Sequence, residues 1–184
     1  MKKIAIIAAM GTAFAIAGVQ AAGNGTINFT GNVTSQTCNA TIGSTASGTA
    51  ATVTLPTVQA NVLATAGNTA GQTAFNIAVT GCAATNPTNA GTVKAFFEKG
   101  ATVDANGRLT NQTTTGGASN VALQLVEGTA NTPINVGDAT QNTGNFATIT
   151  GSSATLPYAV RYYATGTATA GAVSSSVTYS LIYN

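Results

Sequence analysis

Two cysteines, Cys38 and Cys82, are the residues of this chain with the clearest potential for covalent chemistry. In an oxidising compartment such a pair forms a disulfide, whereas a reactive thiol pair needs a close motif or an activating neighbour. Neither of these is visible around the two cysteines. A bridge between them would close a loop of about 45 residues, which the chain-entropy model values at about 4 kcal/mol. We therefore predict a structural disulfide, provided that the chain is exported.

The N-terminal segment has the features of a secretory signal peptide. Residues 1–3 supply positive charge, Ile4–Val19 is almost wholly apolar or small, and Val19-Gln20-Ala21 fits a small-residue cleavage site. A transmembrane anchor is the weaker interpretation, because the apolar run is short for a span and polar chain follows it. We predict a signal peptide over residues 1–21 and a mature chain that starts at Ala22 or one residue later. The prediction places Cys38 and Cys82 in an oxidising compartment.

Charge is scarce and balanced once the predicted signal is removed. The formal net charge of +2 for the whole chain includes the two signal lysines. The remaining basic residues are Lys94, Lys99, Arg108 and Arg161, and the acidic residues are Glu98, Asp104, Glu127 and Asp138. Without a basic patch to neutralise phosphates, nucleic-acid binding is excluded. Low net charge favours association between copies, although a neutral secreted monomer has the same composition.

The parts that enzymes need are largely missing. The chain has no histidine, so it lacks an imidazole base, a Ser-His triad and a histidine metal site. Asp104 lies in a turn, but "DANGR" lacks the further acidic ligands of a calcium loop. The Gly-rich stretches contain no Lys-Ser/Thr pair and precede no helix pattern, so they are not phosphate-binding loops. We expect neither an enzyme nor a cofactor or metal site.

Other polar and aromatic residues have ordinary structural interpretations. Asn-x-Thr sequons arise by chance in a chain this rich in Asn and Thr, and we assign them no function. Lys94, Lys99 and Glu98 are expected to be solvated charges at strand ends. A tyrosine cluster could stack a sugar, but tyrosines in a β-sandwich are more often core residues, and we favour the core. The sequons include Asn28, Asn32, Asn39 and Asn111, and the cluster comprises Tyr158, Tyr162 and Tyr163.

Short apolar runs between Gly, Asn, Thr and Pro residues predict an all-β fold. About seven or eight strands with long polar connections fit a single immunoglobulin-like sandwich. The Asn106-Gly107 pair suits a tight hairpin. The strands are predicted at about 26–34, 51–58, 73–82, 92–100, 121–128, 156–165 and 173–184.

The first predicted strand raises the question of its partner. In "GTINFTGNVTSQTC", Ile27, Phe29 and Val33 point to one face, with Gly31 between them. Polar residues occupy the other face. A new N-terminus is usually frayed unless something holds it. From periodicity alone, this strand would simply pair within its own domain.

The last predicted strand alternates in the same way. Apolar side chains occupy one face, and Ser or Thr occupy the other, interrupted only by Ile182. The apolar face comprises Val173, Val177, Tyr179, Leu181 and Tyr183.

In combination, these features make the mature chain resemble the major pilin subunits of chaperone–usher fimbriae, of the type 1 and P-pilus kind. The matching segments are "GTINFTGNV", the cysteine contexts "VTSQTC" and "FNIAVTGC", the strands "VALQLVEG" and "LPYAVRYYATG", and the ending "SVTYSLIYN" with its penultimate Tyr183. The likeness extends over essentially all of Ala22–Asn184.

The resemblance implies an immunoglobulin-like fold that lacks its last strand and has a hydrophobic groove beside its C-terminal strand. A periplasmic chaperone lends a strand to that groove, and at the outer-membrane usher the next subunit's N-terminal extension replaces it. The implied organisation is a signal peptide at 1–21, a donor-strand extension at 22–34 and a pilin domain at 35–184. The implied donor residues are Ile27, Phe29, Gly31 and Val33, and the implied groove and chaperone edge comprises Val177, Tyr179, Leu181 and Tyr183.

The function that the resemblance implies is that of a structural subunit of a surface fimbria, which polymerises with copies of itself and supports adhesion. The alternatives are a minor or adaptor pilin, or a secreted β-sandwich module that binds sugar.

Overall fold

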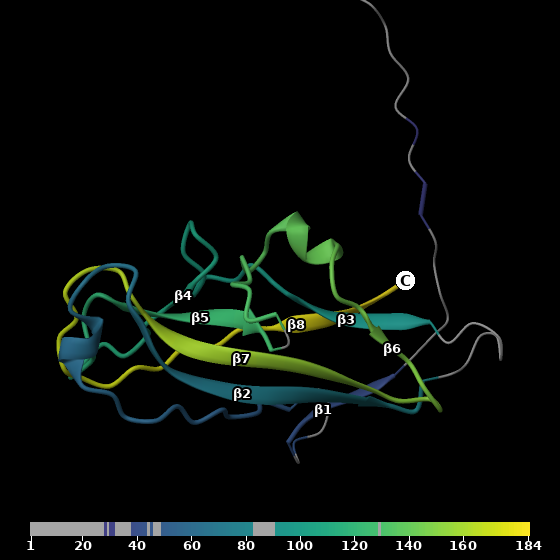
Figure 1. Ribbon diagram of the computed structural model, residues 1–184, viewed down its shortest axis with the longest axis horizontal. Helices are drawn as coiled ribbons and strands as arrows, with labels where there is room; N and C mark the ends of the chain where they lie inside the picture. Colours follow the sequence, from purple (N-terminus) through teal and green to yellow (C-terminus); the bar gives the residue numbers. More distant parts are fainter. Residues whose placement is uncertain are drawn as a thin grey trace, which may run out of the picture. The chain divides into compact units, whose positions relative to one another are not determined.

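A computed structural model describes residues 28, 30–31, 38–43, 45, 49–82, 91–128 and 130–184 (Figure 1). One compact unit extends from Thr34 to Asn184. Its regular elements, within the described residues, are eight strands and two short 3-10 helices. The strands are β1 (Asn39–Ile42), β2 (Thr69–Thr80), β3 (Thr92–Phe97), β4 (Leu109–Thr110), β5 (Val121–Glu127), β6 (Ala147–Thr148), β7 (Ala154–Ala164) and β8 (Tyr179–Tyr183), and the helices are η1 (Ala60–Leu63) and η2 (Ala139–Asn142).

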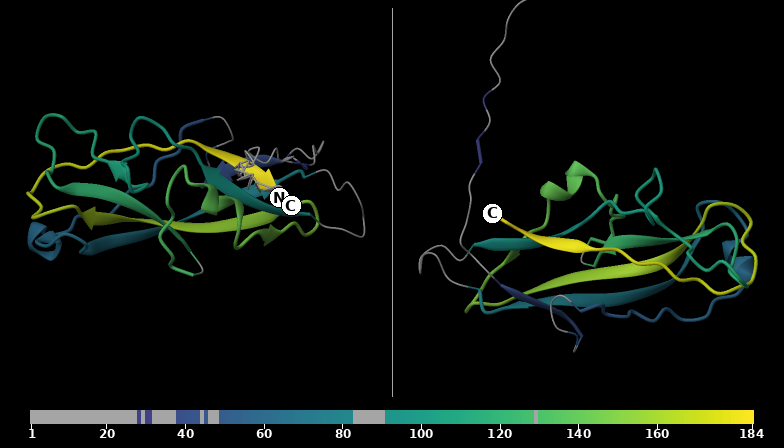
Figure 2. Two further views of the ribbon diagram at one scale, coloured as in Figure 1. Left: turned by 90° about the horizontal axis from the view of Figure 1, so that it is seen from above. Right: turned by 180° about the vertical axis from the view of Figure 1, so that it is seen from behind.

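The strands form two antiparallel sheets that pack as a sandwich. The larger sheet has the order β1-β2-β7-β5-β4, and the smaller has the order β6-β3-β8. The long pairing of β2 with β7 joins Phe75 to Tyr158 and Ile77 to Leu156, with one irregularity between Ala70 and Thr73. Figure 2 shows β8, in yellow, at the border of the smaller sheet. The all-β prediction is confirmed.

Alternation along each strand determines which side chains enter the core. In β2, Ile77 and Val79 are fully buried while the residues between and beside them are more exposed. Leu156, Tyr158 and Val160 occupy the matching face of β7. Side chains two residues apart lie on the same face of a strand, so both strands turn their apolar sets toward the smaller sheet. The predicted core role is therefore correct for Tyr158.

A short turn before β4 has the predicted hairpin geometry. The Asp104 carboxylate accepts hydrogen bonds from the amides of Asn106 (2.8 Å) and Arg108 (2.9 Å). Gly107 has a φ of +70°, and a Cβ at this position would collide with Asn135 and the Val136 amide. Only glycine combines that backbone conformation with such a close approach. The Asn106-Gly107 prediction is confirmed.

Tyr158 connects the two sheets through the core. Its ring meets that of Phe97 edge to face at 5.0 Å, and its hydroxyl accepts a hydrogen bond from the Ala95 amide at 3.1 Å. Burial raises the pKa of Tyr158, and the hydrogen bond from Ala95 partly opposes this rise. At neutral pH the phenol is therefore neutral, as a buried hydroxyl must be to avoid an unpaired charge.

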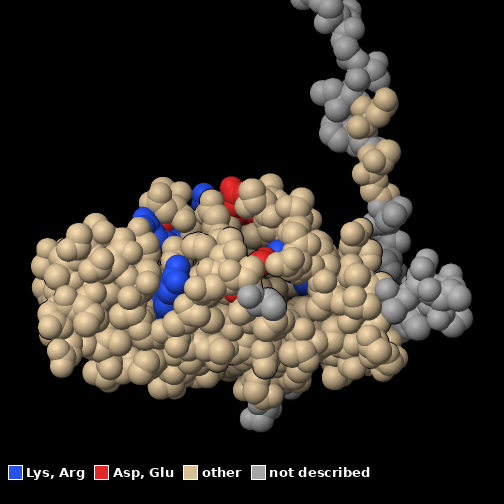
Figure 3. Space-filling view, in the orientation of Figure 1, with Lys and Arg blue, Asp and Glu red and all other residues tan. Residues whose placement is uncertain are grey.

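Lys94 is not the solvated charge that we expected from the sequence. It is only 5% exposed, and its ammonium donates to Glu127 Oε1 at 2.6 Å and to the Thr143 carbonyl at 3.1 Å. Glu127 also accepts from the Asn145 amide at 3.0 Å. The pair joins β3 of one sheet to the end of β5 in the other. On the face shown in Figure 3, most of the surface is uncharged.

Replacing Lys94 with methionine should destabilise the domain, because Glu127 would lose its partner in a largely buried position. We expect a loss of about 3 kcal/mol, the lower end of the range for breaking a buried ion pair. Urea unfolding of the Lys94→Met variant measures this loss. The double variant Lys94→Met/Glu127→Met should recover most of the stability, and equal losses in the two variants would contradict the pairing.

Candidate strand-binding site

Among the described residues, strand β8 has a partner on one side only. It pairs with β3 in the register Tyr179–Phe97, Leu181–Ala95 and Tyr183–Val93, and it ends the smaller sheet. Asn184 and Thr92 exchange both backbone hydrogen bonds, at 2.9 and 3.0 Å. Bonded pairs alternate along an antiparallel ladder, so the amides and carbonyls of Tyr179, Leu181 and Tyr183 point away from β3. These groups form an open edge.

The open edge continues into the segment before β8. The Thr178 carbonyl accepts from the Glu98 amide at 2.9 Å, and the Ser174 carbonyl accepts from the Gln112 amide at 2.7 Å. The Asn111 side chain accepts from the Ser174 amide at 3.0 Å and donates to the Ala172 carbonyl at 3.0 Å. The backbone groups of the even-numbered residues 172, 174 and 178 thus have hydrogen-bond partners on the side of Asn111, Gln112 and Glu98. Those of the odd-numbered residues 173, 175 and 177 point to the other side.

Asn111 belongs to one of the sequons. Its amide also donates to the Ala118 carbonyl at 2.9 Å, and its oxygen also accepts from the Thr113 amide at 3.1 Å. Both ends of the side chain are therefore used to join two loops, which gives this asparagine a structural role.

A second extended segment, residues 51–58, is predicted from the sequence to be an alternating strand, and a strand in a sheet pairs with a neighbour. The prediction of alternation is correct, since Val53 and Leu55 are half-buried between exposed Thr52, Thr54 and Pro56. The prediction of pairing is wrong for the described residues, because no backbone hydrogen bond joins this segment to another part of the described chain. Its apolar side chains Val53 and Leu55 pack on the core.

We use the word groove for ten apolar residues of β1, β2, β7, segment 51–58 and the C-terminal segment that pack against the core but are only partly buried. In the right panel of Figure 2, the yellow C-terminal segment and the blue segment 51–58 run along opposite sides of the sandwich face seen from behind. Both segments turn their apolar residues toward the common core. A complete sandwich would bury such residues fully. The groove residues are Ile42, Val53, Leu55, Phe75, Tyr162, Val173, Val177, Tyr179, Leu181 and Tyr183.

The two ends of the groove differ. At one end, a cavity of about 290 Å³ is lined by Val58, Leu63, Tyr162 and Val173, among others. At the other end, the Tyr183 hydroxyl lies beside the backbone of Cys38. Burial raises the pKa of Tyr183, and the neighbouring Cys38 backbone partly opposes the rise. Tyr183 therefore connects the β8 edge to the start of β1.

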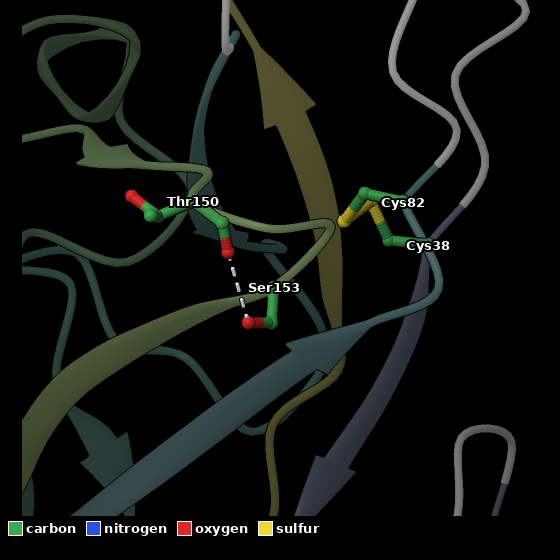
Figure 4. Close-up of a disulfide and its surroundings, with 4 residues drawn as sticks. All are labelled: Cys38, Cys82, Thr150 and Ser153. Carbon is green, nitrogen blue, oxygen red and sulfur yellow. Dashed lines mark hydrogen bonds between the residues drawn. A yellow bond between two sulfur atoms is a disulfide. The ribbon is translucent and has the colours of Figure 1, made fainter.

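The disulfide between Cys38 and Cys82 is confirmed and stabilises the Tyr183 end of the groove. Figure 4 shows it beside the turn of Thr150 and Ser153. The Cys82 amide donates to the Ser152 carbonyl at 3.1 Å, and the Ser153 hydroxyl donates to the Thr150 carbonyl at 3.1 Å. The bridge thus fixes the position of Cys38, where the chain enters the domain.

The groove offers no charge to a ligand. All ten groove residues are apolar or aromatic, and burial raises the pKa of Tyr179 as well. Among the described residues, no group of three or more His, Cys, Asp or Glu side chains could hold a metal ion. No helix in the described part of the chain is long and apolar enough to cross a membrane. The apolar side chains beside the β8 edge suit an extended apolar chain, which could bind through burial and backbone hydrogen bonds.

The other side of β3 is covered, in contrast to the open side of β8. Strand β6 pairs with the first two residues of β3, and the Tyr158 hydroxyl accepts a hydrogen bond from the Ala95 amide. Gln141 accepts from the Phe97 amide at 3.0 Å and donates to the Phe97 carbonyl at 3.1 Å. A glutamine side chain thus takes the place of a neighbouring strand. Covering one edge leaves the β8 side as the place for strand addition to the smaller sheet.

The residues predicted from the sequence are placed as follows. Val177, Tyr179, Leu181 and Tyr183 share the inward face of the C-terminal segment. Of the implied donor residues, Ile27, Phe29 and Val33 lie outside the described residues. Gly31 is exposed and lies outside any strand. The signal-peptide prediction, residues 1–21, also lies outside the described residues.

Several groove residues were not predicted as part of a site. The alternation of Val53 and Leu55 was recognised, but it does not show whether a strand has a neighbour. Phe75 lies on the same face of β2 as the buried Ile77 and Val79 and is only half-buried. Gln141 lies in a polar stretch with few strand signals, so no sequence pattern marks its role. Tyr163 faces the guanidinium of Arg108, 4.5 Å from the ring centroid, and is not a core residue.

Comparison with known proteins gives consistent results. The family model described as FimA: Type-1 fimbrial protein, A matches residues 55–184. The major fimbrial subunit SMF-1 of Stenotrophomonas maltophilia (strain K279a) is 47% identical over 116 residues, which are 60% of this chain and 64% of that protein. The F17 fimbrial protein of Escherichia coli is 42% identical over 112 residues, which are 59% of this chain and 61% of that protein. The matched region thus spans under two thirds of each relative's length.

Solved structures resemble the fold. The Burkholderia pseudomallei antigen and type I fimbria protein has a TM-score of 0.51 at 30% identity, with 80% of this chain and 95% of that chain covered. A chain from the structure of a chaperone–usher pilus has a TM-score of 0.57 at 20% identity, with coverage of 88% and 96%. The sandwich is therefore immunoglobulin-like, as predicted.

Replacing Gln141 with alanine should destabilise the domain by about 1–3 kcal/mol, because the buried amide and carbonyl of Phe97 would lose hydrogen bonds. Urea unfolding of Gln141→Ala measures the change. The neighbouring Asn142 is exposed and makes a matched control, for which a change within about 0.5 kcal/mol is expected. Equal, small effects of the two substitutions would show that Gln141 does not hold the edge.

Proposed function

The chain belongs to the type-1 fimbrial protein family, and we propose that it is a structural subunit of a surface fimbria in which the N-terminal segment of one copy fills the groove of another. The observation that carries this proposal is the open edge of β8 beside half-exposed core residues. An added strand would satisfy the backbone groups and bury the apolar side chains at once. The proposed organisation is a signal peptide at 1–21, a donor segment at 22–34 and the domain at 35–184.

The donor segment has the chemistry that the groove requires. Ile27, Phe29 and Val33 share one face of an extended chain. Burying each side chain fully is worth about 1.5–3 kcal/mol in transfer terms. Gly31 permits the close backbone approach that a side chain would prevent. The groove supplies apolar walls and unpaired backbone groups, so the two surfaces are complementary in character.

Geometry favours addition from a different copy over folding back. Tyr183 contacts Cys38, so the chain enters its domain at the β8 end of the groove. Val33 precedes Cys38 by five residues and lies within about 18 Å of it. A segment that folded into its own groove from this end would have to run parallel to β8. A segment from another copy can run antiparallel, which is the more stable arrangement and the direction of every strand pair in both sheets.

Antiparallel addition also produces a head-to-tail fibre. The incoming segment leaves the groove at the Val173 end, and its domain follows there. The accepting copy extends its own segment from the opposite, Cys38 end. Such a heterologous contact propagates and does not close on itself. The near absence of net charge leaves little repulsion between successive copies.

A lone subunit needs a helper before it assembles. An open edge beside exposed apolar residues favours aggregation during export. We therefore include in the proposal a periplasmic chaperone that covers the groove and an outer-membrane usher where the donor segment replaces it. Both partners come from the family resemblance. The assembled fimbrium would lie at the cell surface and support adhesion.

Deletion of Ala22–Val33 should leave a subunit that accepts a donor segment but cannot attach to another copy. Size-exclusion chromatography and electron microscopy of the purified truncated subunit with added peptide 22–34 test this expectation. We expect a stable complex of one domain and one peptide, and no fibres. Fibres composed only of the truncated subunit would refute the proposal.

Phe29→Asp should block elongation, because a charged group would enter an apolar groove without a partner. Asn28→Asp introduces the same charge on the opposite face of the strand and should have little effect. Fibre length by electron microscopy distinguishes the two variants. If they behave alike, the assignment of faces is wrong.

A further inference from the structure

Lys94 and Asn145 contact the two oxygens of one carboxylate, that of Glu127. The Lys94 ammonium donates to Oε1 at 2.6 Å, and the Asn145 side-chain amide donates to Oε2 at 3.0 Å. The three residues come from β3, from β5 and from the segment before β6. Asn145 satisfies the second oxygen of a partly buried carboxylate. The same three groups are also an amine, a carboxamide and a base, which are the parts required to form an amide bond.

The Lys94 ammonium lies against the backbone of the segment that contains Asn145. It donates to the Thr143 carbonyl at 3.1 Å, and a Cβ placed on Gly144 would lie 3.6 Å from Nζ. Gly144 has a φ of +93°, a left-handed conformation that favours glycine at this turn. Nζ is therefore close to the residue that directly precedes Asn145. Because folding already brings the two groups together, a bond between them needs no further association.

The surroundings keep most of the water away from the amine and the base. The Lys94 side chain is 6% exposed, and that of Glu127 is 19% exposed. A cavity of about 220 Å³ adjoins both side chains, and its lining includes Ile134 and Gly144. This cavity leaves space for the reacting groups to move toward each other. Asn145 is exposed, so ammonia released there reaches the solvent directly.

We propose that Lys94 and Asn145 form an intramolecular amide bond after folding, with Glu127 as the base. Glu127 takes a proton from the ammonium, and the free electron pair of Nζ attacks Cγ of Asn145. The bond from Nζ to Cγ forms and the bond from Cγ to Nδ2 breaks, while the carboxylate passes protons from Nζ to Nδ2. Nδ2 leaves as ammonia, which departs with the remaining proton as ammonium, and Glu127 is again a carboxylate. One amide replaces another, so no oxidant or cofactor is required.

The arrangement selects one lysine. Lys99 is exposed and has no ion pair or side-chain hydrogen bond in the described part of the chain. Its neighbour Glu98 accepts from the Ser180 hydroxyl at 2.6 Å and contacts no amine there. Lys94 is therefore the lysine that has both a base and a carboxamide beside it.

The bond would join β3 covalently to the segment that leads into β6, at the covered edge of β3. Neither Lys94 nor Asn145 belongs to the groove, so this inference does not depend on the proposed function. The ion pair between Lys94 and Glu127 is the state before the reaction. The loss of stability predicted for Lys94→Met therefore refers to chains in which the amide bond has not formed.

Mass spectrometry of the purified, denatured mature chain tests the proposal. After reduction of the disulfide, the mass should be lower by one ammonia than the mass of the sequence. Trypsin should no longer cleave after Lys94, because the side chain is acylated, and should still cleave after Lys99. The fragment that ends at Lys99 and fragment 109–161 should then appear as one branched species.

Substitutions separate the cross-link from the ion pair. Lys94→Arg keeps a positive charge beside Glu127 but has no amine nucleophile, so the full mass and tryptic cleavage after residue 94 should return. Asn145→Ser removes the carboxamide and Glu127→Gln removes the base, and each should abolish the loss of ammonia. Asn142→Ser, at an exposed position in the same segment, is the matched control and should leave the cross-link complete.

Three results would overturn the proposal. The first is the unchanged sequence mass with normal cleavage after Lys94 in protein that has been aged after folding. The second is a loss of ammonia without the branched fragment, which would identify a cyclised asparagine. The third is a loss of ammonia that persists in the Lys94→Arg chain. The protein is denatured before each measurement, so these readouts hold whether or not the chain assembles into fibres.

Discussion

Backbone amides and carbonyls at a sheet edge must find partners, and this requirement organises the whole domain. Strand β8 satisfies one side of its backbone through β3 and leaves the other side open. Segment 51–58 is extended, yet it has no backbone partner among the described residues. The apolar side chains between these two segments are only half-buried. Within the described residues, the sandwich therefore has an unpaired edge at β8 and an extended segment without a backbone ladder, and the proposed strand addition would satisfy the first of these.

The two edges of the smaller sheet differ in how their backbone groups are covered, and this difference determines where a strand could be added. The side chains of Gln141 and Tyr158 form hydrogen bonds with backbone groups of β3 that have no partner strand among the described residues. The β8 side has no such cover. Among the described residues, one edge of the smaller sheet is protected and the other is open, so the proposed strand addition would have one favoured place in this sheet. Tyr183 and the Cys38–Cys82 bridge then fix where the chain enters the domain. In the proposed fibre, the direction of growth would follow from that anchor.

Much of the fold could be predicted from local pattern. Alternating runs located β2, β5 and β7 to within a few residues, and the Asn106-Gly107 pair marked a hairpin. The apolar face of Tyr179, Leu181 and Tyr183 was also visible. Lys94 was misjudged because its neighbours in sequence do not show Glu127, which lies 33 residues away and in the other sheet. The alternation of neighbouring residues shows which face of a strand a side chain lies on, but it does not show which distant residue that side chain contacts.

The sequence by itself determined the class of fold, the disulfide partners and the two amphipathic segments, because periodicity and composition are properties of neighbouring residues. Only the tertiary structure decided that, among the described residues, segment 51–58 and the side of β8 away from β3 lack ladder partners, that Gln141 covers β3 and that the buried Ser175 hydroxyl has no hydrogen-bond partner. An alternating strand has the same pattern whether its neighbour is present or absent. The presence of that neighbour depends on how distant segments pack.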